Sequence, residues 1–138
     1  MYQPILLATG NQGKKAEMAA ILDEVRIMPL YLKDFPDLPE AVEDGATFTE
    51  NARKKALHYL HLTGLPVIAD DSGLEVEALG GSPGVHSSRY AATDEERIAR
   101  LLRELDGVLA ENPGLGREAR FACAICMAWP DGKLLETF

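Results

Sequence analysis

The sequence predicts a single α/β domain. Short apolar runs of strand length alternate with segments in which apolar side chains recur at helical spacing. Clusters of glycine, proline and aspartate separate these segments, as is typical of turns between strands and helices. The 138 residues are 46% hydrophobic and 26% charged, which is enough to build one globular core.

The first apolar run, residues 5–8, is expected to form a buried strand. A glycine turn over residues 9–13 leads into a helix over residues 14–22, and a second strand is expected over residues 26–32. The apolar side chains expected on the buried face of this helix are Met18, Ile21, Leu22 and Val25.

An acidic loop that contains prolines follows over residues 34–45. Thr47 and Glu50 then have the spacing of a capping box, which predicts the start of a helix that ends near Leu62. Residues 65–69 form the next predicted strand, because an apolar run follows the Gly-Leu-Pro segment that breaks the helix.

In the second half of the chain, a glycine-rich loop over residues 80–84 precedes another capping box, formed by Thr93 and Glu96. The apolar residues that we expect this helix to bury are Ile98, Leu101, Leu102 and Leu105. A strand-like run over residues 120–129, a Pro-Asp-Gly turn and residues 133–138 predict a β-hairpin.

The two cysteines, Cys123 and Cys126, lie within this strand-like run. Side chains three apart in a strand point to opposite faces, so the two thiols are poorly placed to share a metal ion or to form a disulfide. We expect both to be small buried hydrophobic residues.

The formal net charge of −8 argues against a general nucleic-acid partner. It does not exclude a small anionic substrate, because a few lysines and a metal ion can override the global sign. No apolar run approaches the roughly 20 residues that span a bilayer. No basic segment precedes the first apolar run, in contrast to a signal peptide. We therefore expect a cytoplasmic protein without a membrane partner.

The segment Thr9-Gly10-Asn11-Gln12-Gly13-Lys14 joins the first predicted strand to the first predicted helix. Glycines allow backbone N–H groups to approach an anion, the helix N-terminus adds a favourable dipole, and Lys14 adds a full positive charge. The spacing is not that of a Walker A loop, because two residues rather than four separate Gly10 from Gly13. These residues alone support phosphate binding and an ordinary strand-to-helix turn equally well.

Asn51 and Lys55 are four apart in the second predicted helix and so share one face. The pair is suited to meet a phosphate, although a solvated basic face is the simpler interpretation, since residues 53–55 are all basic. The carboxylates of the preceding loop, among them Glu40 and Glu43, suit a hard cation such as Mg²⁺. Loop carboxylates are far more often solvated turn residues.

The sequence Asp70-Asp71-Ser72-Gly73 is expected at the carboxyl end of its strand, where open α/β sheets bind ligands. The two aspartates should point in different directions. One carboxylate is suited to hold Mg²⁺ or to accept a proton from water, and Ser72 to donate to a phosphate; a turn cap explains the motif equally well. Taken jointly, two anion-binding candidates and two carboxylate clusters favour a Mg²⁺-dependent phosphate enzyme.

Four motifs together resemble those of the inosine triphosphate pyrophosphatase family, whose bacterial members are called dITP/XTP pyrophosphatases or non-standard purine NTP pyrophosphatases. They occur in the order and spacing of the family, at residues 9–14, 47–56, 69–74 and 79–90. The resemblance implies Mg²⁺-dependent hydrolysis of ITP, dITP and XTP to the monophosphate and pyrophosphate, which cleanses the nucleotide pool. It also implies an elongated, two-lobed mixed sheet flanked by helices, and a homodimer.

The same resemblance implies roles for individual residues. Asp71 is implied as the proton acceptor and a metal contact, and Glu43, or less favourably Glu40, as a second Mg²⁺ ligand. Water is implied to attack the α-phosphorus. The residues implied to bind the substrate are Thr9, Gly10, Asn11, Gln12, Gly13, Lys14, Lys55 and Ser72.

The family pattern continues past the predicted hairpin with a Phe-Gly-Tyr-Asp motif and a Ser-His-Arg motif, which contact the base. Neither motif occurs in this sequence. We therefore expect residues 1–138 to form one pyrophosphatase-like domain that lacks the last third of the family pattern. The alternative hypothesis is a non-catalytic domain that binds nucleotide phosphates or packs against a partner.

Overall fold

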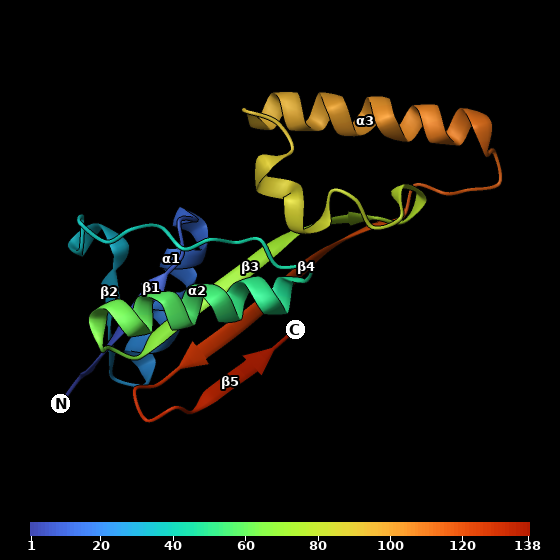
Figure 1. Cartoon of the computed structure of the whole chain (residues 1–138). Coiled ribbons are helices and arrows are strands. Elements are labelled where there is room, and N and C mark those ends of the chain that lie inside the picture. Colours follow the sequence, from blue (N-terminus) through green and yellow to red (C-terminus); the bar gives the residue numbers. More distant parts are fainter. The chain divides into compact units, whose positions relative to one another are not determined.

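The computed structural model describes residues 1–138 and contains one five-stranded mixed sheet with strand order β2-β1-β3-β4-β5 (Figure 1). The strands are β1 (Gln3–Ala8), β2 (Ile27–Tyr31), β3 (Val67–Val76), β4 (Ala119–Ala128) and β5 (Leu134–Thr137). The α-helices are α1 (Gln12–Glu24), α2 (Phe48–Thr63) and α3 (Asp94–Glu111). The prediction of a mixed α/β sheet with flanking helices is confirmed.

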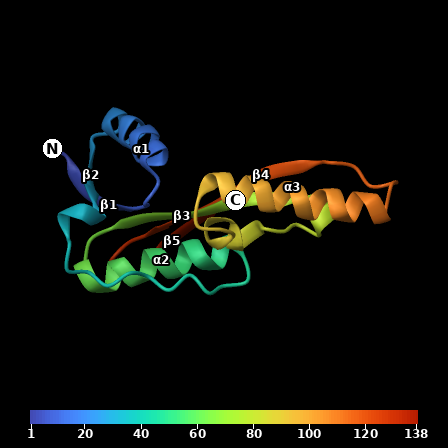
Figure 2. The same cartoon turned by 90° about the horizontal axis from the view of Figure 1, so that it is seen from above.

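Strand β1 lies at the centre of the parallel part of the sheet. It pairs in parallel with β2 from Gln3↔Ile27 to Leu7↔Tyr31, and with β3 from Leu6↔Val67 to Ala8↔Ala69. Parallel neighbours need a crossover connection, which α1 supplies between β1 and β2. Helices α1 and α2 cover opposite faces of these strands (Figure 2).

A small apolar core lies between α1 and the strands β1 and β3. Its buried members are Ile5, Leu7, Leu22 and Ile68. On α1, Leu22 is buried as expected, whereas Ile21 is 63% exposed. Val25, the residue that follows the helix, is 61% exposed. The sequence therefore predicted more buried residues on α1 than the structure shows. The strands contact Leu22 but leave Ile21 exposed.

The ends of the helices follow the capping signals. Thr47 accepts a hydrogen bond from the backbone N–H of Glu50 at 3.1 Å, so the first half of the expected capping box is present. The second half differs, because the Glu50 carboxylate accepts from the backbone N–H of Ala46 instead of Thr47. At α3 both halves form between Thr93 and Glu96.

The β-hairpin is confirmed, since β4 and β5 pair antiparallel from Ile125↔Thr137 to Ala128↔Leu134. From Ala122 to Ala128, buried side chains on β4 alternate with exposed or half-buried ones. Cys126 is buried but Cys123 is exposed, so the expectation that both are buried is wrong for Cys123. They form no disulfide, and their burial differs as expected for residues on opposite faces of a strand.

The chain divides into two compact units. Unit 1 comprises Met1–Asp71 and Ala124–Phe138, and unit 2 comprises Ser72–Cys123. Helix α3 of unit 2 buries Leu105 but leaves Ile98 59% and Leu102 45% exposed, so the prediction that all its apolar residues are core is wrong. Within unit 2, α3 packs against the short helical turn at residues 77–79, which contacts only part of its apolar face.

None of the helices combines the length and the apolar composition that a membrane span requires.

Candidate active site

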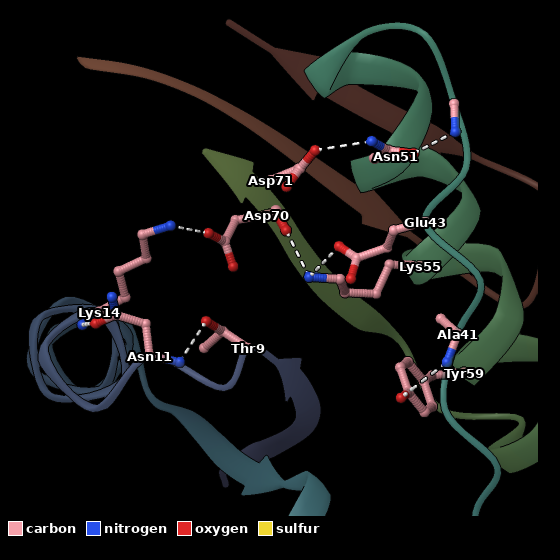
Figure 3. Close-up of polar contacts among 11 residues, drawn as sticks. Thr9, Asn11, Lys14, Ala41, Glu43, Asn51, Lys55, Tyr59, Asp70 and Asp71 are labelled. Atoms are coloured by element: carbon pink, nitrogen blue, oxygen red, sulfur yellow. Dashed lines mark hydrogen bonds and ion pairs between the residues drawn. The ribbon is translucent and has the colours of Figure 1, made fainter. Parts of the chain in front are cut away.

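The acidic pair lies inside β3, not at its end as the sequence predicted. Strand β3 continues to Val76, but its pairing with β1 stops at Ala8↔Ala69. Asp70 and Asp71 are therefore the first residues of β3 beyond the carboxyl end of β1. The strand alternation directs Asp70 towards α1 and Asp71 towards α2 (Figure 3), so the two point in different directions, as predicted.

Asp70 is a buried carboxylate, 3% exposed, that forms an ion pair with the ammonium group of Lys14. Its Oδ2 atom accepts the lysine, whereas its Oδ1 atom is buried without a hydrogen-bond partner. A buried carboxylate oxygen is costly to leave unsatisfied, so this atom is available to a cation or another donor.

The turn between β1 and α1 positions Lys14. The Thr9 hydroxyl accepts from the backbone N–H of Asn11 at 3.3 Å, and the Asn11 side chain accepts from the backbone N–H of Lys14 at 3.0 Å. Asn11 is thus the N-cap of α1. Gly10 and Gly13 do not adopt positive φ, so this turn does not depend on the special backbone conformations of glycine.

Asp71 is held by a buried amide. Its Oδ2 atom accepts from Asn51 Nδ2 at 3.0 Å, and Asn51 Oδ1 accepts from the backbone N–H of Gly45 at 2.7 Å. Burial raises the pKa of Asp71; the hydrogen bond from Asn51 opposes this effect and the negative charge of Glu43 adds to it. Asn51 therefore contacts the carboxylate of Asp71, a partner that neither interpretation of the sequence named.

Lys55 lies between the two acidic segments. Its ammonium group is 2.9 Å from the Glu43 carboxylate and donates at 2.9 Å to the backbone oxygen of Asp70. Lys14 and Lys55 are thus both in contact with Asp70, one through the side chain and one through the backbone. The structure brings together two ammonium groups and the carboxylates of Glu43, Asp70 and Asp71.

Other predicted site residues lie apart from this cluster. Glu40 is exposed and makes none of the contacts that join Glu43 to Lys55. Gln12 lines a separate surface hollow with Lys15, Tyr31 and Lys33. Ser72 is half-buried and follows Asp71 in β3, at the start of unit 2.

The structure contains no group of three or more His, Cys, Asp or Glu side chains arranged to hold a metal ion. The cationic groups that contact these carboxylates are Lys14, paired with Asp70, and Lys55, paired with Glu43.

Two contributions to the site were not predicted from the sequence. The first is Asn51 as the partner of Asp71, and the second is Tyr59, whose hydroxyl accepts from the backbone N–H of Ala41 at 3.4 Å. Asn51, Lys55 and Tyr59 recur at intervals of four along α2, so they share one face. The sequence shows this spacing, so it could have predicted the shared face. It could not predict that this face contacts the acidic loop.

A protein-family model for the Ham1 family matches residues 5–138. The chain belongs to the Ham1 family. Among curated relatives, the chain is 52% identical over 132 residues to a dITP/XTP pyrophosphatase of Geobacter sulfurreducens, covering 94% of this chain and 64% of the relative. It is 48% identical over 134 residues to a dITP/XTP pyrophosphatase of Syntrophobacter fumaroxidans, covering 95% of this chain and 55% of the relative.

Among solved structures, a HAM1 protein from Coxiella burnetii matches with a TM-score of 0.86 and 40% identity, over 97% of this chain and 68% of that one. The family resemblance and the fold class are therefore both confirmed. The chain spans 55–64% of the length of these two curated Ham1 relatives.

Proposed function

We propose that this Ham1 chain carries the phosphate-binding and catalytic residues of an enzyme that hydrolyses ITP, dITP and XTP to the nucleoside monophosphate and pyrophosphate. The names of relatives that are about half identical to it over almost its whole length support this substrate class. The observation that carries the proposal is the contact of two lysines, Lys14 and Lys55, with the strand segment that bears Asp70 and Asp71. A polyphosphate needs such positive charge beside its reacting phosphorus.

The turn at residues 9–14 and Lys55 would bind the triphosphate. Lys14 stands in the first turn of α1, where backbone N–H groups and the helix dipole favour an anion. Thr9, Asn11 and the glycines shape this turn, and Ser72 is a further donor candidate next to Asp71. A bound triphosphate would compete with Asp70 for Lys14, and with Glu43 for Lys55.

Mg²⁺ is the proposed cofactor, and the residues present fit it. Asp70 has a buried oxygen without a partner. The negative charge of Glu43 adds to the effect of burial in raising the pKa of Asp71, and a cation between Glu43 and Asp71 would relieve this repulsion. Asp71 and Glu43 would hold the ion, whereas Glu40 is the weaker candidate because it is exposed and outside the cluster. Mg²⁺ commonly takes one or two carboxylates and completes its shell with water and substrate phosphates. When bound, it would neutralise charge on the departing pyrophosphate.

Asp71 is the proposed general base. Its raised pKa makes the carboxylate a better proton acceptor than an ordinary surface aspartate. It would take a proton from water while the water oxygen forms a bond to the α-phosphorus. The bond from the α-phosphorus to the bridging oxygen then breaks, and pyrophosphate leaves with that oxygen.

Product analysis tests the proposal. The chain is incubated with dITP and Mg²⁺, and pyrophosphate and orthophosphate are measured separately without added pyrophosphatase. Release of pyrophosphate in equal amount to dIMP supports the proposal, and orthophosphate with dIDP contradicts it. Binding of dITP without turnover would favour the alternative of a non-catalytic phosphate-binding domain.

A homodimer stays a prediction of the family resemblance, and a cytoplasmic location stays a prediction from the sequence. Sedimentation equilibrium over a range of concentrations distinguishes a dimer from a monomer of 15.0 kDa.

A further inference from the structure

The acidic loop runs along one face of α2 in a regular register. Alternate residues of the loop contact residues one helical turn apart on α2. The pairs are Ala41 with Tyr59, Glu43 with Lys55, and Gly45 with Asn51.

This register has a geometric basis. Two residues of extended chain advance about 6.6 Å, and four residues of α-helix advance about 6 Å. The two repeats nearly match, so three successive pairs form without distortion of either segment. Glu43 occupies the middle pair, and its position along α2 is therefore fixed from both sides.

Asn51 is the pair member whose side chain reaches a carboxylate of β3, whereas the Lys55 side chain reaches the backbone oxygen of Asp70. Its amide oxygen accepts from Gly45, and its amide nitrogen donates to the Asp71 carboxylate. The residue is 1% exposed, and both ends of its amide are satisfied. Exchanging the oxygen and nitrogen would set two donors or two acceptors against each other, so only one orientation is compatible with these neighbours.

Gly45 is adapted to this contact. A Cβ atom at position 45 would lie 2.7 Å from Asn51 Oδ1 and 2.9 Å from Glu50 Cβ. No side chain fits without moving the loop or the amide. The loop thus approaches Asn51 more closely than any other residue type would permit.

We propose that Asn51 is a positioning residue that couples the acidic loop to Asp71, so that Glu43 and Asp71 keep a fixed relation. This inference rests on the proposed function for its catalytic consequence, but the coupling itself exists without substrate. Asn51 touches neither substrate nor metal in this role; it acts through the two segments that it joins.

Hydrogen exchange of the Gly45 amide measures the coupling directly, without substrate. Replacing Asn51 with Ala removes the acceptor, and exchange at Gly45 should accelerate at least ~10-fold. Asn51→Asp keeps an acceptor for Gly45 but places a carboxylate against Asp71. This variant therefore disrupts the contact with Asp71 while it retains the contact with Gly45. Asp71→Ala leaves Asn51 intact yet removes its other partner, and should accelerate exchange at Gly45 several-fold, by about 3-fold or more.

The catalytic consequence is measured as a split between kcat and KM for dITP. Asn51→Ala and Asn51→Asp should lower kcat by about 100-fold, because misplacing a reacting group by about 1 Å costs that much. KM should change by less than about 3-fold, since the lysines that bind phosphate are untouched. Asn112→Ala, which removes an exposed asparagine that donates to Val108 in unit 2, is the matched control and should change neither quantity.

Two results would overturn the proposal. One is exchange at Gly45 that is unchanged by Asp71→Ala, which would show that the two contacts of Asn51 are independent. The other is a raised KM with unchanged kcat, which would make Asn51 a substrate-binding residue. If Asn51→Ala does not fold, Asp71→Ala still gives the exchange readout at Gly45, and Asn51→Asp still gives the split between kcat and KM. If the chain shows no turnover at all, the proposed function fails while the exchange experiment still decides the coupling.

Discussion

Lys14 on α1 neutralises Asp70 on β3, a side chain that is 4% exposed and has a second oxygen without a partner. The pair joins the first turn of α1 to the strand that carries the proposed catalytic residue. Removing one member of such a pair leaves an uncompensated charge in the interior. The pair is therefore a stabilising contact. Its two members are also candidates to bind ligands, Lys14 an anion and the free oxygen of Asp70 a cation.

Replacing Lys14 with Met should lower the free energy of unfolding by about 2 kcal/mol, less than for a fully buried pair because the Lys14 side chain is 27% exposed. Urea denaturation at pH 7 measures it. The matched control is Lys54→Met, which removes an exposed ion pair with Asp44 and should cost less than about 0.5 kcal/mol. Equal losses in the two variants would contradict the special role of the Lys14–Asp70 pair.

Asp71→Asn should abolish turnover and raise stability at neutral pH. Burial raises the pKa of Asp71 above its ordinary value of 3.8, so between the two values the folded state holds more protons than the unfolded state. Stability therefore falls as the pH rises through this window, and the ionised carboxylate is a net cost at pH 7. The substitution removes this cost and retains an acceptor for Asn51.

We expect the melting temperature of Asp71→Asn to exceed that of the unmodified chain by about 2 °C at pH 7. The difference should shrink as the pH is lowered to 3.8 and below, where the native aspartate is protonated in both states. A lower melting temperature at pH 7 would show that the carboxylate stabilises the fold.

Gly73 in unit 2 should tolerate no side chain. A Cβ atom there would lie 2.4 Å from the backbone oxygen of Gly84 and 2.5 Å from Ser87 Oγ. That hydroxyl donates to Gly84 and accepts from the backbone N–H of Leu74, so it cannot move freely. Gly73→Ala should lower the free energy of unfolding by about 2–3 kcal/mol, as measured by urea denaturation.

Gly107→Ala is the control for Gly73→Ala, because a Cβ atom at this position of α3 meets nothing within 4 Å. It should stabilise the chain by up to about 1 kcal/mol, since alanine favours the helix. Similar losses at both positions would show that the close approach at Gly73 does not matter.

Tyr90 should stabilise unit 2 in a pH-dependent manner. Its hydroxyl donates to Glu104, and this hydrogen bond, followed by that from Arg100, lowers the pKa of Glu104 below its ordinary 4.5. A lowered pKa means that the unfolded state binds the proton more tightly. The contribution is therefore present above pH 4.5 and is lost as the pH falls through the lowered pKa.

Tyr90→Phe should cost about 1 kcal/mol at pH 7, because it removes a hydrogen bond to a charged group and leaves the buried ring in place. The cost should diminish below pH 4.5. Tyr2→Phe, which removes an exposed 3.3 Å contact with Asp23, is the matched control and should change stability little at any pH. A cost of Tyr90→Phe that does not vary with pH would exclude Glu104 as the partner that matters.

Local patterns predicted most of the fold. The capping residues Thr47 and Thr93 begin their helices as expected, and the Pro-Asp-Gly turn forms the hairpin, because these signals act over a few residues. The exposure of Ile98 and Cys123 could not be predicted in this way. Burial of a side chain depends on which other part of the fold packs against its helix or strand. The periodicity of the sequence does not reveal that partner.

The sequence predicted which residues belong to the candidate site, but not which of them contact one another. Lys14, Lys55 and Asp71 were found from their motifs, and the structure places them in one cluster. The end of β3 was misplaced, because the apolar run stops at Ala69 whereas the strand itself continues to Val76. The contact of Asn51 with Asp71 was not predicted, because the two residues lie 20 apart in sequence and only the tertiary fold joins them.

The position of bond cleavage is the most direct test of the proposed mechanism. The chain is incubated with dITP and Mg²⁺ in water enriched in ¹⁸O, and the products are analysed by mass spectrometry. Attack of water on the α-phosphorus, promoted by Asp71, places the label in dIMP and leaves pyrophosphate unlabelled. Label in pyrophosphate, or label in orthophosphate released with dIDP, would contradict the account.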